Sequence, residues 1–166
     1  MKNRGKQFEG VIRESFLKVP DVSIDRIHDQ TTKNKGSSNI CDFIVYKKPH
    51  EYYIECKSIH GNTFPLSNIT DTQWKGLLKK SQILGVHAGI ICWWIDKDVT
   101  KFLPIQLLEY LKTVKGKKSI RYDFEPFDRN TIICNAFNFI EITGKKKRIL
   151  FDYDMEQFLK EAENAI

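Results

Sequence analysis

The chain lacks the cysteine pattern of a zinc site or a disulfide framework. Its cysteines, at positions 41, 56, 92 and 134, are scattered and include no C-x-x-C pair. The histidines, at positions 28, 50, 60 and 87, show no metal-ligand spacing either. Structural zinc and cross-linked scaffolds are therefore disfavoured. Cys41, Cys56 and Cys92 lie in strand-like runs, and we expect them to be small core residues.

Long hydrophobic runs and repeats are also missing. No apolar stretch approaches the length of a membrane span, and no apolar signal segment follows the basic residues 1–6. We find no internal repeat and no low-complexity tract. A length of 166 residues suits one core and is short for two. We therefore expect one domain over residues 1–166, located in the cytoplasm and not in a membrane.

The charge is unbalanced toward basic residues. The chain has 27 Lys and Arg against 21 Asp and Glu, a formal net charge of +6 and a pI near 9.1. Lys and Arg bind polyanions because phosphates release their counterions as these side chains replace them. The composition thus favours a nucleic-acid partner, although a merely basic surface would have the same composition.

Hydrophobic periodicity predicts helices alternating with strands around one sheet. A continuous apolar run at Ile90–Ile95 suits a central strand, with Trp93 and Trp94 in the core. The fold class expected is α/β or α+β, with a central mixed β-sheet flanked by helices. The expected helices are 5–18, 72–84 (with Leu84 on its apolar face), one that Pro104 opens, and 154–164. The expected strands are 22–28, 41–46, 51–57, 90–95 and 99–103, and a second hairpin pairs 138–143 with 148–151. Residues 115–130 are expected to be irregular.

The strands 41–46 and 51–57 form a predicted hairpin that turns between Lys48 and Pro49. Facing residues then have numbers that sum to 97, so Asp42 lies opposite Glu55. Lys57 follows Glu55 by two residues and points to the same face. The other face is predicted to carry Cys41, Phe43, Val45, Tyr52, Ile54 and Cys56. A bulge in either strand would shift this pairing by one residue.

Two facing carboxylates repel each other, whereas a divalent cation bound between them makes the net interaction attractive. Magnesium takes oxygen ligands and keeps several waters. Held by Asp42 and Glu55, it would polarise a phosphodiester oxygen and lower the pKa of an attacking water. Lys57 would orient that water or stabilise charge on the phosphate. The simpler alternative is a surface hairpin with an ion pair between Lys57 and an acid.

The spacing D-x12-E-x-K of Asp42, Glu55 and Lys57 resembles the PD-(D/E)XK nuclease superfamily. Further segments, in order along the chain, resemble the RecU-type Holliday junction resolvases of Gram-positive bacteria and their phages. Each segment alone is weak, but the ordered set is specific. These segments are Asn3-Arg4-Gly5-Lys6-Gln7-Phe8-Glu9, Thr63-Phe64-Pro65-Leu66, Asp71-Thr72-Gln73-Trp74 and Gly116-Lys117-Lys118-Ser119-Ile120.

The resemblance implies a homodimeric endonuclease with a PD-(D/E)XK-like fold that cuts four-way DNA junctions with Mg²⁺, for which Mn²⁺ would substitute, in recombination or repair. No small-molecule cofactor is implied. Asp42 and Glu55 would bind the metal, and Lys57 would assist the water. Glu9 would approach the metal directly or through water. Gln73 would contact phosphate or water. On the residues alone, Glu9 is a solvated helix residue and Gln73 a helix-start residue.

One departure from the family concerns the stalk that reaches into the junction, which here is shortened to about residues 29–38. The shortening puts junction selectivity in doubt more than cleavage. A restriction-type or flap-cutting nuclease and a non-catalytic binder of branched DNA therefore stay as alternatives. The basic residues expected to contact DNA are Arg4, Lys6, Lys33, Lys35, Lys117 and Lys118, with Thr31 and Thr32 as further candidates.

Overall fold

The computed structural model describes residues 4–27, 39–126 and 138–164. Within them, no helix has the length and apolar character needed to cross a membrane. The elements are α1 (Arg4–Phe16), β1 (Ser23–Arg26), β2 (Phe43–Lys47), β3 (His50–Ile59), β4 (Thr63–Pro65), η1 (Leu66–Asn68), α2 (Asp71–Lys80), β5 (Val86–Trp94), η2 (Ile95–Lys97), β6 (Val99–Pro104), α3 (Ile105–Thr113), β7 (Ser119–Arg121), β8 (Ile140–Glu141), β9 (Gly144–Lys146), β10 (Phe151–Tyr153) and α4 (Met155–Glu163).

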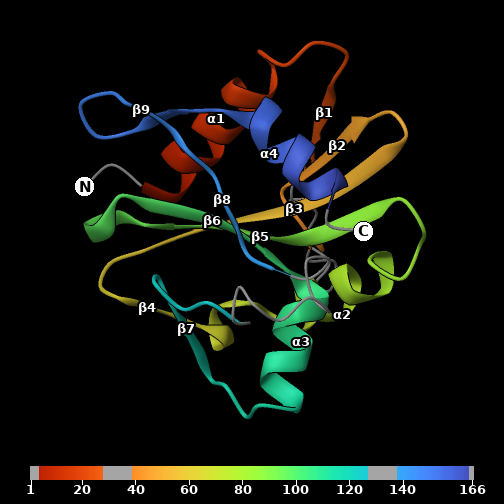
Figure 1. The fold of residues 1–166 in the computed structure, drawn as a ribbon, viewed down its shortest axis with the longest axis vertical. Coiled ribbons are helices and arrows are strands. Elements are labelled where there is room, and N and C mark those ends of the chain that lie inside the picture. The colour runs from red at the N-terminus through yellow and green to blue at the C-terminus, as the bar shows by residue number, and fades with distance from the viewer. Residues whose placement is uncertain (1–3, 28–38, 127–137, 165–166) are drawn as a thin grey trace, which may run out of the picture.

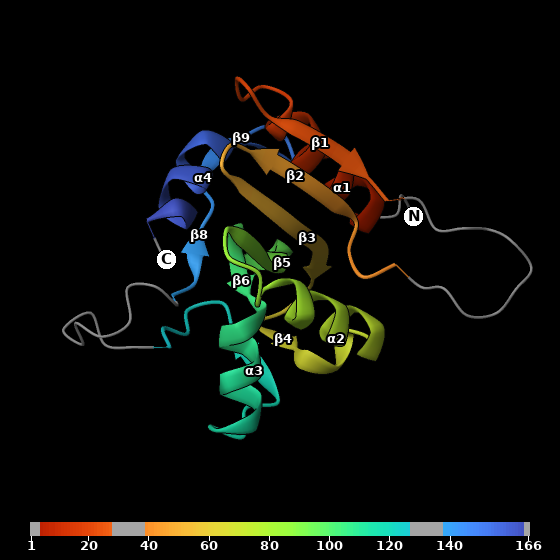
Figure 2. The same cartoon turned by 90° about the vertical axis from the view of Figure 1, so that its right-hand side faces the viewer.

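A central mixed sheet organises these elements. Its strand order is β1-β2-β3-β5-β6-β8, and only the β3–β5 pair within it is parallel. Helices α1 and α4 cover one face, and α2 and α3 cover the other (Figures 1 and 2). The predicted fold class, a central mixed sheet flanked by helices, is confirmed.

The apolar run of β5 is buried on both faces, as predicted. Ile91 and Trp93 pack into the core beneath α1 and α4, which we call the first core. Cys92 and Trp94 pack into the core beneath α2 and α3, the second core. The exposed fractions of Trp93 and Trp94 are 1% and 0%, so both tryptophans are core residues.

Helix α2 is shorter than the sequence predicts. A capping box fixes its start, since Thr70 accepts a hydrogen bond from the Gln73 N–H and Gln73 accepts one from the Thr70 N–H. The helix ends at Lys80 rather than at residue 84. Leu84 therefore lies beyond the helix and is 93% exposed, so its predicted place on the buried face is wrong.

Short strands account for the other differences. Residues 115–130 were predicted as irregular, but Ser119–Arg121 pairs with Thr63–Pro65 in a two-stranded ribbon of β4 and β7. The second hairpin joins β9 to β10, while β8 pairs with β6 in the main sheet. The turn lies within 147–150 instead of at Gly144-Lys145. Two- and three-residue strands carry too little hydrophobic alternation to be recognised from sequence.

Gly89 in β5 offers a test of how tightly the sheet packs. A Cβ there would lie 2.4 Å from the Leu103 carbonyl oxygen and 2.8 Å from the Phe102 ring. We expect Gly89→Ala to lower the free energy of unfolding by at least about 2 kcal/mol in urea titrations. Gly10→Ala is the control, because Gly10 is exposed in α1 with nothing within 4 Å. It should stabilise by about 0.5–1 kcal/mol, and equal effects of both changes would contradict the packing.

Candidate active site

The β2–β3 hairpin has the register that the sequence predicts. Its facing residues run from Phe43 opposite Ile54 to Lys47 opposite His50, and every pair sums to 97. The turn lies at Lys48–Pro49, as expected. The hairpin therefore brings the segment with Asp42 beside the middle of β3, where Glu55 and Lys57 lie.

The ladder becomes irregular at Asp42 itself. Its backbone N–H donates to the Ile54 carbonyl at 3.0 Å, and its carboxylate Oδ2 accepts the Cys56 N–H at 2.8 Å. The paired strand begins only at Phe43, so Asp42 lies in a bend outside the regular ladder, where the strict alternation of side chains no longer holds. Cys41 consequently packs in the second core with Tyr53, whereas Phe43 packs in the first. The prediction that Cys41 shares a face with Phe43 is wrong.

The carboxyl groups of Asp42 and Glu55 nevertheless lie close enough for each to shift the pKa of the other. Burial, followed by the Asp42 charge, raises the pKa of Glu55 to about 7. Burial also raises the pKa of Asp42, against hydrogen bonding by the Cys56 N–H. Near neutral pH the pair thus retains a proton, because two unscreened negative charges at this spacing repel each other strongly.

Lys57 and Gln73 both hold the same oxygen of Glu55. The Lys57 Nζ lies 2.8 Å from Glu55 Oε1, and the Gln73 side-chain amide donates to that oxygen at 2.7 Å. The capping box occupies the carbonyl oxygen of Gln73, so its NH₂ group is left to point at Glu55. Gln73 is therefore both the helix-start residue and a neighbour of the site. The sequence predicted its proximity through the resemblance alone.

Glu9 also lies at the site. It lines a cavity of about 360 Å³ together with Lys6, Asp42, Glu55 and Gln73. Its carboxylate pairs with Arg26 at 2.5 Å. Among the residues that the structure describes, no three His, Cys, Asp or Glu side chains form a metal-binding group. Sequence reasoning missed Arg26; its place in a strand antiparallel to β2 was the available signal.

The donor set at Asp42 and Glu55 fits a hard divalent cation. When a metal ion binds, two carboxylates that share a proton release that proton, and the charge of the metal removes their mutual repulsion. Mg²⁺ is commonly bound through one or two carboxylates plus waters and phosphates, so it does not require a third acid. The cavity lining also includes exposed Lys6, next to Glu9, where an anionic substrate would enter.

The predicted DNA contacts fall in different places. Lys6 lines the cavity, and Arg4 donates to Gln7 at 3.5 Å within α1. Lys117 and Lys118 are exposed beside β7 and line a separate hollow of about 580 Å³. Lys33 and Lys35, with Thr31, Thr32 and the shortened stalk, lie outside the described residues.

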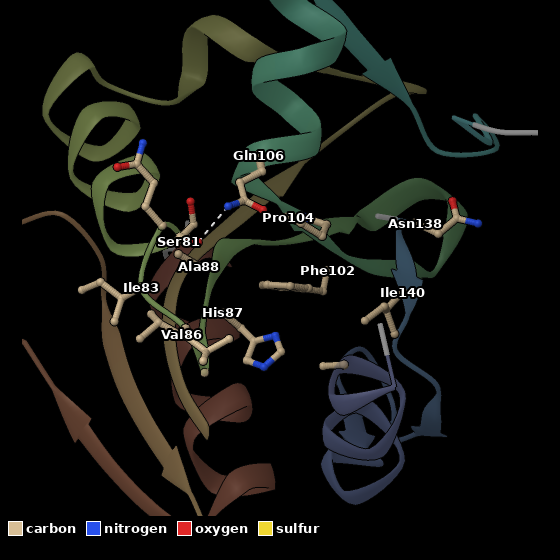
Figure 3. A pocket seen from close by; sticks show the side chains of 14 residues that line it. Ser81, Ile83, Val86, His87, Ala88, Phe102, Pro104, Gln106, Asn138 and Ile140 are labelled. Carbon is tan, nitrogen blue, oxygen red and sulfur yellow. Dashed lines mark hydrogen bonds between the residues drawn. The ribbon is translucent and has the colours of Figure 1, made fainter. Parts of the chain in front are cut away.

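A third hollow, of about 360 Å³, has a mainly apolar lining (Figure 3), which includes neither Asp42 nor Glu55. The side chains of Phe102, Ile140 and Val86 line it, and no carboxylate is among its described lining residues. His87 also faces it and stacks on Tyr52, with ring centroids 4.6 Å apart. Burial and the neighbouring His50 lower the pKa of His87 to about 4. Its described lining has no carboxylate to hold a hard cation, so the acidic cavity is the better candidate for the active site.

Comparisons with known proteins give likenesses to solved structures alone. No family model and no curated protein matches the chain. A matching solved structure is that of Hjc, a Holliday junction resolvase from the archaeal hyperthermophile Archaeoglobus fulgidus. The TM-score is 0.47 with 17% sequence identity, over 62% of this chain and 78% of that chain. A likeness of this extent carries no functional argument, so function has to be judged from the site.

The raised pKa of Glu55 makes a testable prediction for stability in EDTA. An acid whose pKa is higher in the folded state stabilises the protein fully below its unfolded pKa of 4.5 and loses that stability as pH rises through about 7. Asp42→Asn removes the charge that opposes Glu55 ionisation. The difference in free energy of unfolding between this variant and wild type should therefore shift in favour of the variant by about 1–3 kcal/mol as the pH is raised from 5 to 8.

Urea titrations at both pH values measure this difference. His87 titrates in the same range with the opposite sign, because its folded pKa is lowered. His87 is common to both chains, so it cancels in the comparison. Parallel pH profiles of wild type and Asp42→Asn would contradict a coupled carboxyl pair.

Proposed function

We propose that the protein is a magnesium-dependent DNA endonuclease with Asp42, Glu55 and Lys57 at its catalytic centre. The observation that supports this most is the pair of adjacent carboxylates, with Glu55 buried, Asp42 half-buried and the Lys57 ammonium 2.8 Å from Glu55. A surface hairpin with an ion pair would have no reason to bury Glu55, whose exposed fraction is 5%. The basic composition supplies the second support, because the substrate is a polyanion.

Each residue has a role that follows from its contacts. Asp42 and Glu55 would hold the cation, and the Cys56 N–H fixes the orientation of the Asp42 carboxylate. Lys57 would orient the attacking water or stabilise charge on the phosphate, since its Nζ lies beside the metal position. Gln73 holds Glu55 in place and would contact water or phosphate. The bound Mg²⁺ would supply Lewis acidity and a water of lowered pKa, and Mn²⁺ would substitute for it.

Glu9 and Arg26 would form the outer wall of the site. Arg26 engages Glu9 at 2.5 Å, so Glu9 would reach the cation through water rather than directly. With a substrate bound, the Arg26 guanidinium is also available to a phosphate oxygen, which matches its bidentate geometry.

The substrate that we propose is a four-way DNA junction, cut by a homodimer in the cytoplasm. This follows from the resemblance to RecU-type resolvases and from the need to cut two opposed strands together. The shortened interval 29–38 favours a second candidate with the same site, a restriction-type or flap-cutting nuclease. Synthetic junctions, linear duplexes and flapped DNA, compared at equal concentration, discriminate between the two.

Asp42→Asn tests the nuclease proposal. The change removes one metal ligand with little change in shape, so cleavage of a labelled four-way junction in Mg²⁺ should fall by at least about 10³-fold. Junction binding in EDTA should be largely retained. The matched control is Glu51→Gln, an acid on the same strand outside the cavity lining, which should cut at the wild-type rate.

The outcomes separate the three functions. Paired nicks in the junction support a resolvase, and cutting of linear or flapped DNA supports the second candidate. Junction binding without cleavage under any divalent metal indicates a non-catalytic module. If Asp42→Asn cuts as fast as wild type, the catalytic assignment is wrong.

A further inference from the structure

A buried lysine lies on the same sheet face as the proposed catalytic residues. Lys101 of β6 is 5% exposed. The register pairs Lys57 with Cys92 and Cys92 with Lys101, so the three side chains form one row across β3, β5 and β6. Residues paired in this way point to the same face, here the second-core face. Two strand spacings separate Lys57 from Lys101, a distance of about 10 Å between their Cα atoms.

Lys101 is bound to the segment that follows β7. Its Nζ donates to Glu125 Oε1 at 3.3 Å, and the Glu125 side chain is 53% exposed. Tyr122 and Phe124, from the same segment, pack against the second core. The buried ammonium thus attaches the 121–125 segment to the sheet, beside the row that contains Lys57.

This segment and the β4–β7 ribbon form a charged hollow of about 580 Å³. Lys118 and Arg121 are exposed at its rim, and Asp123 accepts two hydrogen bonds from the Arg121 guanidinium, at 2.6 and 3.0 Å. The Arg121 contact, with a smaller contribution from Lys101, lowers the pKa of Asp123. With Lys101 and Lys117, four cations lie in or beside this hollow against the two acids Asp123 and Glu125, which leaves an excess of positive charge.

From this arrangement we propose that Lys118 and Arg121 bind phosphates of the DNA strand flanking the scissile one. The proposal rests on the nuclease function, because it places the strand across Lys57. Lys101 is a positioning residue: it neutralises the two acids and holds the segment against the sheet.

Arg121 and Asp123 give variants of opposite sign. Arg121→Gln removes a cation and leaves Asp123 unpaired, so the affinity for a fluorescein-labelled junction in EDTA should fall about 3- to 10-fold. The slope of log K against log salt should become shallower by about 0.9 for each lost phosphate contact. Lys118→Gln should act likewise. Asp123→Asn frees the guanidinium and should tighten binding by about 2- to 5-fold.

The matched control is Lys160→Gln, an exposed lysine on α4, over the other face of the sheet. It should leave affinity and salt slope unchanged. If Arg121→Gln and Lys118→Gln behave like this control, or if the chain shows no salt-dependent DNA binding, the inference is wrong. If the wild-type protein cleaves DNA but Arg121→Gln and Lys118→Gln bind as tightly as wild type, only this inference is overturned. If binding depends on Lys118 and Arg121 but the protein cleaves no DNA, this inference stands and the nuclease function is overturned.

Lys101 is tested by removing and then restoring its charge. Lys101→Met fills the same buried space, and replacing a buried ion-pair member by an apolar residue of similar volume need not destabilise when its partner stays in water. Junction affinity should nevertheless fall about 3- to 10-fold, because Asp123 and Glu125 lose their neutralising cation. Lys101→Arg should restore the affinity. Equal affinities of Lys101→Met and wild type at equal melting temperature would contradict a positioning role.

Discussion

The repulsion between Asp42 and Glu55 is the constraint around which the site is built. Burial removes the water that would screen two neighbouring carboxylates, and the pair consequently keeps a proton near pH 7. The Cys56 N–H, the Lys57 ammonium and the capped Gln73 hold the two groups in place despite that cost. Such a concentration of devices around an unfavourable pair is typical of a site whose charge is completed by a ligand.

The sheet divides the molecule into a scaffold side and a working side. On the face under α1 and α4, the first core is apolar and anchors both termini of the described chain (Figure 2). The opposite face carries Glu55, Lys57 and, two strands away, Lys101, with α2 contributing Gln73. Rigid strands therefore fix the spacing between Lys57 and Lys101, and Lys101 attaches the segment with the proposed DNA contact to the sheet.

The sequence predicts the long elements and the hairpin well, because their hydrophobic periods are strong. The sum rule for facing residues holds from Phe43 to Lys47. It fails at Asp42, because the chain bends there before the strand begins at Phe43, and Cys41 packs in the other core. Alternation alone does not show where so short a strand begins. Leu84 was misplaced because apolar spacing alone does not show where α2 ends.

The candidate site was predictable only where it depends on local strand geometry. Asp42, Glu55 and Lys57 are linked by strand geometry, which is local, whereas the Glu9–Arg26 and Lys101–Glu125 pairs join segments distant in sequence. Charge alone does not specify such partners, since 27 basic and 21 acidic residues allow many pairings. The resemblance supplied Glu9 and Gln73, but the contacts that hold them came only from the tertiary structure.

Calorimetric titration of the metal-free protein with Mn²⁺ near pH 7 tests the central claim most directly. If Asp42 and Glu55 share an ion, one Mn²⁺ should bind per chain and displace the proton held by the pair, so the heat should depend on the ionisation enthalpy of the buffer. Asp42→Asn should abolish this binding. An absence of Mn²⁺ binding in wild type, or equal binding by wild type and Asp42→Asn, would contradict the account.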